Sequence, residues 1–90
     1  MTDRRVFKYP VPIADAFALE LPEGAEVLAV QVQHGQPCIW ALVNTRVRSA
    51  PRHFRLARTG QVVGEVTRHV GSFQTLGSAK MFHLFEVANG

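Results

Sequence analysis

The sequence predicts an all-β domain, a small sandwich or partly open barrel of six to seven short, mainly antiparallel strands. Apolar and polar residues alternate over short β-rich segments, and Gly- and Pro-containing turns separate these segments about every 8–12 residues. Few segments carry a helical period. With 90 residues, of which 47% are hydrophobic and 19% charged, the chain fits one folded domain covering residues 1–90.

Two strands are predicted before the first clear turn. Residues 4–9 alternate and contain β-favouring aromatic and branched residues, so they form the first predicted strand. Pro10 and Pro12 then remove two backbone donors, which requires an extended segment at a sheet edge or outside the sheet. Residues 15–21 form the second predicted strand, with three large apolar residues on one face: Phe17, Leu19 and Leu21. The turn Pro22-Glu23-Gly24 ends it.

The clearest strand signal covers residues 26–33. Alternation predicts that three of its residues face the core: Leu28, Val30 and Val32. The glutamines between them, Gln31 and Gln33, face water or a partner. A hairpin turn at residues 34–37 follows, because Gly35 can take a positive φ at no steric cost.

The next predicted strand, residues 38–44, is apolar on both faces. One face carries Cys38, Trp40 and Leu42, and the other carries Ile39, Ala41 and Val43. Both faces should therefore be covered, either by a second sheet with a loop or by another copy of the chain. We expect Trp40 to lie in the core. We expect Cys38 to be a small buried hydrophobe, because a lone cysteine cannot form an internal disulfide.

Three more strands are predicted in the second half. Residues 45–51 form an Arg-rich connection, and residues 52–58 form a strand with Phe54 and Leu56 inward and His53 and Arg55 outward. Residues 61–67 fit a loop, a short helix or a strand with a bulge at Gly64. The last two strands cover residues 68–76, interrupted by Gly71, and about 79–87, with a turn at Gly77-Ser78. The last strand is apolar on both sides except at Glu86, which should pair with an arginine on a neighbouring strand.

The charge is distributed unevenly along the chain. The formal net charge is +3, yet five of the seven acidic residues fall within the first 26 residues, and none occurs between residues 27 and 64. Half of the basic residues lie within that acid-free stretch: Arg46, Arg48, Arg52, Arg55 and Arg58. Arginine suits phosphate and carboxylate groups, so this segment predicts an anion-binding face. The alternative is a solvated face that the acidic first third balances.

No group of residues in the sequence predicts catalysis. The chain shows no nucleophile elbow, phosphate loop or dinucleotide fingerprint, and Ser72 and Thr75 fit ordinary strand positions. The four histidines lack metal-ligand spacing: His34, His53, His69 and His83. We therefore expect a protein that is not an enzyme and holds no metal or cofactor. His34 sits beside Gly35 in a turn, where it either binds a ligand or caps the turn.

Membrane insertion and secretion are not expected. The longest apolar run, residues 38–43, is far shorter than the ~20 residues needed to span a bilayer. Arg4 and Arg5 near the N-terminus are not followed by the apolar segment of a signal peptide. These features predict a soluble, cytoplasmic protein.

Several blocks resemble an uncharacterised family of small bacteriophage and prophage proteins. The most specific is the block over residues 31–43, Gln-x-Gln-His-Gly-x-Pro-Cys-Ile-Trp-Ala-Leu-Val. Further similar segments are Lys8-Tyr9-Pro10, Leu21-Pro22-Glu23-Gly24-Ala25, Val70-Gly71-Ser72-Phe73-Gln74 and Phe82-His83-Leu84-Phe85-Glu86, so the similarity covers nearly the whole chain. Lys80-Met81 and the arginines of residues 46–58 depart from the pattern. The resemblance implies a domain of unknown function in a phage accessory protein and assigns no site residues.

Three functions are open from the sequence. The first is a non-enzymatic homo-oligomer that binds an anionic small molecule, such as a nucleotide signal, and acts against host defence in the host cytoplasm. Its ligand would contact Arg52, Arg55, Arg58 and His34, at a site that subunits could share. The second is a protein-interaction or virion component that binds a host protein or itself and has no small ligand. The third is a weak nucleic-acid binder, which the scarcity of stacking aromatic residues disfavours.

Overall fold

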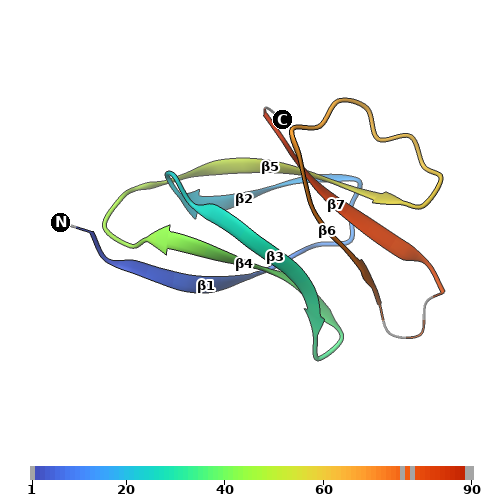
Figure 1. Cartoon of the computed structure of the whole chain (residues 1–90), viewed down its shortest axis with the longest axis horizontal. Coiled ribbons are helices and arrows are strands. Elements are labelled where there is room, and N and C mark those ends of the chain that lie inside the picture. Colours follow the sequence, from blue (N-terminus) through green and yellow to red (C-terminus); the bar gives the residue numbers. More distant parts are fainter. Residues whose placement is uncertain (1, 76, 78, 89–90) are drawn as a thin grey trace.

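The part of the chain that the structure describes folds into seven antiparallel strands in two sheets, which confirms the all-β prediction (Figure 1). The computed structural model describes residues 2–75, 77 and 79–88, and no helix occurs among them. The strands are β1 (Arg4–Pro10), β2 (Ala16–Pro22), β3 (Glu26–Gln33), β4 (Gln36–Asn44), β5 (Ser49–Arg58), β6 (Arg68–Gln74) and β7 (Met81–Val87). One sheet has the order β1-β4-β3 and the other β2-β5-β7-β6. The two sheets are separate, so the described strands form a sandwich rather than a closed barrel.

The three-stranded sheet is built around β4. β4 pairs with β1 on one side and with β3 on the other. Gln33 pairs with Gln36, so His34 and Gly35 form a two-residue hairpin turn, and both have positive φ values of 51° and 77°. That combination suits the right-handed twist of the paired strands. The predicted hairpin is confirmed, but its turn is shorter than residues 34–37, because Gln36 and Pro37 already belong to β4.

One residue of β3 faces the opposite way from the prediction. Leu28 was expected in the core, but it is 43% exposed, while its neighbour Val27 is fully buried. The register of β3 against β4 shifts between Val27 and Ala29, so an extra residue interrupts the alternation there. A bulge of this kind turns Leu28 out of the core and leaves Val30 and Val32 facing in, as predicted.

The four-stranded sheet confirms most of the predicted alternation in the second half. Phe54 and Leu56 of β5 are buried, and Leu84 of β7 is fully buried beside them. β5 begins at Ser49 rather than at residue 52, because Pro22, Leu21 and Glu20 of β2 pair with Ser49, Ala50 and Pro51. The predicted connection over residues 45–51 therefore shortens to a turn after β4.

The remaining boundaries differ by a few residues or lie outside the description. Residues 61–67 contain neither helix nor strand, which settles that ambiguous stretch as a loop. β7 begins at Met81, two residues after the predicted start. β6 ends at Gln74, so Thr75 of the predicted strand lies outside it, whereas Leu76 and Ser78 of the predicted strand end and turn lie outside the described residues.

The two sheets pack tightly along the side where β3 lies against β6. Gly71 of β6 sits so close to β3 that an added Cβ would lie 2.8 Å from Cγ1 of Val30. Arg68 of β6 also donates a hydrogen bond of 2.7 Å from Nη2 to the carbonyl oxygen of Val27. Glycine is therefore needed at position 71 for close approach, and this side of the sandwich is closed.

Candidate functional site

The four residues proposed for an anion site lie in separate places. Arg52, Arg55 and Arg58 all belong to β5, where successive side chains alternate between faces. Arg52 and Arg58 therefore point toward the opposite sheet, and Arg55 points away from it. Six residues of strand separate Arg52 from Arg58, a spacing of about 20 Å. His34 lies in the β3–β4 hairpin of the other sheet.

Arg52 makes contacts inside the protein. Its Nε donates to Oε2 of Glu86 at 2.5 Å, and its Nη1 donates to the carbonyl oxygen of Ala25 at 2.8 Å. The Arg52 and Glu86 side chains are only 27% and 13% exposed. The pairing predicted for Glu86 is thus confirmed. The ion pair joins β5 and β7 within one sheet, and the Arg52 hydrogen bond to Ala25, the residue before β3, fastens that sheet to the other.

Arg55 and Arg58 differ in their contacts. Arg55 Nη1 donates to the carbonyl oxygen of Val63 at 2.9 Å and holds the loop over residues 61–67. Among the described residues, the Arg58 guanidinium has no hydrogen bond or ion pair. Arg58 lines an open hollow of about 420 Å³ together with Thr59, Ala79, Lys80 and Met81. Of the predicted arginines of this strand, Arg58 has the most freedom to meet a ligand.

The single cysteine and the hairpin histidine lack the surroundings of reactive groups. Cys38 is buried, as expected, and its thiol donates to the carbonyl oxygen of Gln36 at 3.5 Å. His34 is exposed, and its ring forms no hydrogen bond within residues 2–75, 77 and 79–88. The His34 ring therefore does not cap its turn by a hydrogen bond, and the alternative, that His34 contacts a ligand, stays a prediction.

A chain of polar side chains crosses the outer face of the four-stranded sheet, and the sequence alone did not reveal it. The Ser72 hydroxyl lies 2.7 Å from Nδ1 of His83 and 3.2 Å from Nε2 of His69. Nε2 of His83 lies 2.8 Å from the Thr59 hydroxyl. The His69 ring also packs against Phe85 with 5.2 Å between centroids. The pairing of β6 with β7 creates this network, because Ser72 and His83 are cross-strand partners.

The network resembles only part of a catalytic arrangement. A serine beside a histidine can act as a nucleophile when a third group orients the histidine and oxyanion donors are nearby. Here a threonine hydroxyl occupies the position that a carboxylate would need. No group of three or more metal-ligating side chains was found in the described part of the chain. The network is best described as a polar tie between β6, β7 and the end of β5.

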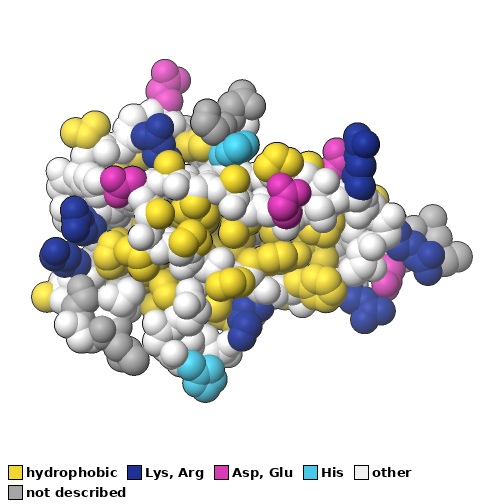
Figure 2. Space-filling model, turned by 180° about the vertical axis from the view of Figure 1, so that it is seen from behind, with side chains coloured by type: hydrophobic (Ala, Val, Ile, Leu, Met, Phe, Trp, Pro, Cys, Tyr) yellow, Lys and Arg dark blue, Asp and Glu magenta, His cyan; other side chains and the backbone are white. Residues whose placement is uncertain are grey.

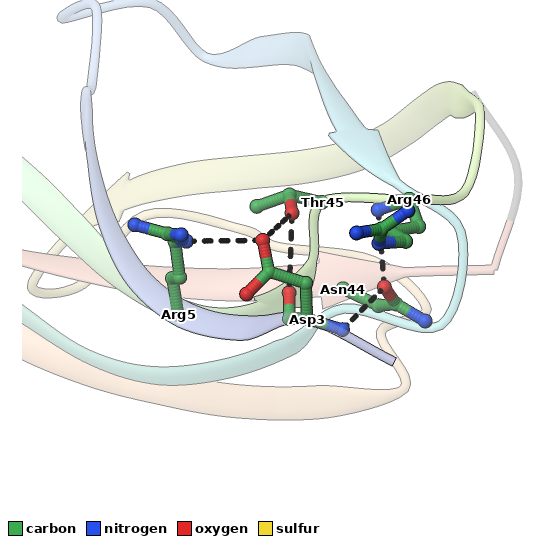
Figure 3. A network of polar contacts seen from close by, with 5 residues as sticks. All are labelled: Asp3, Arg5, Asn44, Thr45 and Arg46. Carbon is green, nitrogen blue, oxygen red and sulfur yellow. Dashed lines mark hydrogen bonds and ion pairs between the residues drawn. The ribbon is translucent and has the colours of Figure 1, made fainter. Parts of the chain in front are cut away.

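Strand β1, by contrast, presents an unusually exposed edge that is firmly anchored at its start. Thr45 Oγ1 donates to Oδ2 of Asp3 at 2.7 Å, and Arg5 Nε donates to the same oxygen at 3.2 Å (Figure 3). Asn44 Oδ1 accepts from the backbone N–H groups of Asp3 and Arg46 (Figure 3). The Thr45 and Arg5 hydrogen bonds lower the pKa of Asp3. The start of β1 is thus fixed to the turn after β4.

The sandwich is open on the side where β1 and β2 are the edge strands. Phe7 pairs with the fully buried Ala41 and so points inward, yet it is 42% exposed. Three further inward residues are only partly buried: Tyr9, Phe17 and Leu19. Burial still raises the pKa of Tyr9. On the closed side, by comparison, Val27 and Leu84 are completely covered. The core is therefore uncovered along the gap between β1 and β2, which we call the apolar opening.

The surface pattern agrees with a partly uncovered interior. Hydrophobic side chains lie along the middle of one broad face of the molecule, and charged side chains surround them (Figure 2). On the outer face of β1, Val6 is 54% exposed, and Ile13 of the β1–β2 loop is 56% exposed. Apolar surface of this kind, with a charged rim, is typical of protein-binding surfaces. No helix among the described residues is long and apolar enough to cross a membrane.

These features define a small all-β sandwich with one closed side and one open apolar side. The model of the family called Domain of unknown function (DUF7352) matches residues 2–90. The chain therefore belongs to the DUF7352 family. A search of curated proteins found no match, and a search of solved structures found none.

Proposed function

We propose that this protein is a non-enzymatic interaction module that binds another protein through the apolar opening. The single observation that supports this proposal most strongly is the exposure of Phe7, an aromatic residue that points into the sandwich. An exposed inward aromatic leaves apolar surface in water, and a protein partner would cover it. The two adjacent strand edges supply unpaired backbone donors and acceptors for such a partner.

The experiment is affinity capture from the cells that produce the protein, with the tagged chain as bait. Phe7→Ser should remove the proteins that wild type captures, because it takes the exposed ring out of the opening. Val62→Ser is the matched control, since Val62 is 91% exposed in the loop after β5, away from both edges. Capture that is equal with both variants would contradict the proposal.

We also propose an accessory role in a phage or prophage, directed at a host protein such as a defence component. Support comes from the resemblance of the block at residues 31–43 to small phage and prophage proteins. The partner in the capture experiment would then be a host protein or the chain itself. Recovery of phage structural proteins alone would favour a virion component instead.

Binding of an anionic small molecule is a second candidate, which one observation favours. The Arg58 guanidinium has no partner among the described residues and faces the hollow that Lys80 and Thr59 also line. A guanidinium without a partner suits a phosphate group, because it can donate two parallel hydrogen bonds. Calorimetry with a panel of linear and cyclic nucleotides should give heat that Arg58→Ala abolishes and Arg46→Ala keeps. Absence of heat with every nucleotide would remove this candidate.

A further inference from the structure

The two strands that border the apolar opening carry opposite charge. Residues 4–10 contain Arg4, Arg5 and Lys8 and no acidic residue, whereas residues 15–23 contain Asp15, Glu20 and Glu23 and no basic residue. The first stretch covers β1 and the second covers β2 with its flanks. The opening is thus bordered by one basic and one acidic edge.

Contacts within the chain neutralise only part of this charge. Arg5 pairs with Asp3, and Glu23 pairs with Arg48. Lys8 donates to the neutral Gln33 of β3 at 2.6 Å, so it keeps its charge, and its ammonium must leave Gln33 to reach a strand at the free edge of β1. Four exposed charges next to the opening form no ion pair with described residues: Arg4 and Lys8 on β1, and Asp15 and Glu20 at β2. Two positive and two negative charges therefore remain available to a partner.

We propose that the partner at the apolar opening is a second copy of this chain, in a twofold dimer in which β1 of each copy pairs with β2 of the other. This inference rests on the proposed function and names its partner. β1 and β2 run in opposite directions within one copy (Figure 1). A twofold axis parallel to the strands leaves the direction of every strand unchanged. Because β1 and β2 run in opposite directions, β1 of one copy then pairs antiparallel with β2 of the other. Joining the three-stranded sheet of one copy to the four-stranded sheet of the other gives two seven-stranded sheets.

Charge selects this arrangement over the other twofold dimer that would cover the same opening. An axis perpendicular to the sheets would place β1 against β1 and β2 against β2. Arg4 and Lys8 would then lie beside the other copy's basic β1, and Glu20 would lie beside the other copy's acidic β2. Like charges on paired strands are destabilising, whereas opposite charges stabilise the pairing. Pairing β1 with β2 sets Arg4 and Lys8 beside the acidic edge.

The side-chain pattern of the two edges fits the same pairing. Phe7 and Tyr9 of β1 point inward, as do Phe17 and Leu19 of β2, so pairing would bring four apolar side chains together over the opening. Arg4 and Lys8 of β1 and Glu20 of β2 alternate with them and point outward. Proline occurs only at the last position of each strand, Pro10 and Pro22, so the backbone donors before it stay available.

The oligomeric state tests the inference directly. Native mass spectrometry and sedimentation of the whole chain over a wide concentration range should show a dimer. Arg4→Glu/Lys8→Glu should raise the dimer dissociation constant about tenfold or more, and Asp15→Lys/Glu20→Lys should do the same. Arg46→Glu, which reverses an exposed charge in the turn after β4, is the control and should leave the constant unchanged.

Combining the reversals separates the two dimers. The four-residue variant swaps the signs of both edges, so it should recover the wild-type dissociation constant if β1 pairs with β2. It would gain nothing if β1 pairs with β1, since like charges would still meet like charges. Recovery also shows that the separate reversals did not simply unfold the chain, which circular dichroism checks independently.

Failure of this inference is distinguishable from failure of the proposed function. A wild-type chain that stays monomeric throughout overturns the dimer. If that monomer still captures a different protein in a Phe7-dependent way, the opening is an interaction surface for another partner. If Phe7→Ser changes neither capture nor oligomeric state, both proposals are overturned.

Discussion

At the scale of single residues, Trp40 shows how alternation divides an apolar strand between two environments. Its neighbours Ile39 and Ala41 point into the core and are fully buried. Trp40 points outward from the three-stranded sheet, is only half-buried, and is paired with Lys8 of β1 and Ala29 of β3. The expectation that Trp40 belongs to the core is therefore wrong, although the strand itself was predicted.

We predict that Trp40→Ala lowers the free energy of unfolding by about 1–2 kcal/mol, because only part of the ring leaves water on folding. Phe54→Ala is the comparison, since Phe54 is 1% exposed and stacks on Phe17. That substitution should cost about 3–5 kcal/mol. Urea denaturation of both variants provides the measurement. Equal losses would show that the outer face of β4 is covered as completely as the core.

The ionisation of the Asp3 carboxyl group makes the stability of the fold depend on pH. Its pKa is lowered first by the Thr45 hydroxyl and then by Arg5. A pKa that is lower in the folded than in the unfolded chain means that the carboxylate favours folding above the unfolded value, near pH 4. That contribution is lost as the pH falls through the lower folded value.

We therefore predict that an NMR titration of the Asp3 carboxyl group in the folded chain has a midpoint below that of unfolded protein. Thr45→Val should move the midpoint upward, because the strongest hydrogen bond to the carboxylate disappears. Thr67→Val is the control, since Thr67 donates to the carbonyl oxygen of Glu86 instead. An unchanged midpoint in Thr45→Val would remove the Thr45 hydroxyl as the cause.

At the scale of elements, Arg52 links three strands: it pairs with Glu86 of the neighbouring β7 and donates to the carbonyl oxygen of Ala25, just before β3. Loss of one partner leaves a charge in a largely covered position without compensation. Arg52→Met should therefore lower the free energy of unfolding by about 2–3 kcal/mol. Arg48→Met should cost less than about 1 kcal/mol, because its pair with Glu23 is exposed.

A double-mutant cycle by urea denaturation checks the origin of this effect. Adding Glu86→Gln to Arg52→Met removes the uncompensated charge, so the double variant should lose less than the sum of the two single losses. Strict additivity would mean that Arg52 acts through its hydrogen bond to Ala25 alone. A large loss confirms a structural role for Arg52 and leaves Arg58 as the better anion-binding candidate.

Alternation alone predicted six to seven strands and most inward residues, but it could not predict where alternation is interrupted. The register shift beside Leu28 depends on how β3 meets β4, and local sequence does not encode that pairing. Ser49 joins β5 only because β2 pairs with it. Period-two spacing does place Arg52 and Arg55 on opposite faces, so the sequence already argued against one shared site for them.

The candidate surfaces depended still more on tertiary pairing. The Ser72–His83 contact requires the register of β6 against β7. The apolar opening arises because β3 packs against β6 while β1 and β2 remain apart as edges. The sequence signal that could have indicated the opening is the contrast between a basic residue 4–10 segment and an acidic 15–23 segment. The net charge of the first half of the chain does not reveal this contrast, because the basic and acidic segments offset each other there.

At the scale of the whole molecule, closed and open sides should differ in dynamics. β4 and β7 have partners on both sides, whereas β1 and β2 each have one. Amides on the free edges of β1 and β2 face water in a single copy and should exchange fast, since exposed backbone groups open at low free energy. Amides of β4 and β7 should exchange only through larger openings.

We predict that this contrast depends on protein concentration. When two copies associate through their edges, β1 and β2 gain hydrogen-bonded neighbours, so exchange there should slow as concentration rises. Exchange in β6, whose free edge lies on the closed side, should change far less. Hydrogen–deuterium exchange at a low and a high protein concentration, read by mass spectrometry of peptic peptides, compares exchange in β1 and β2 with exchange in β6 at each concentration. Slowing in β6 rather than β1 would place the contact between copies on the opposite side of the sandwich.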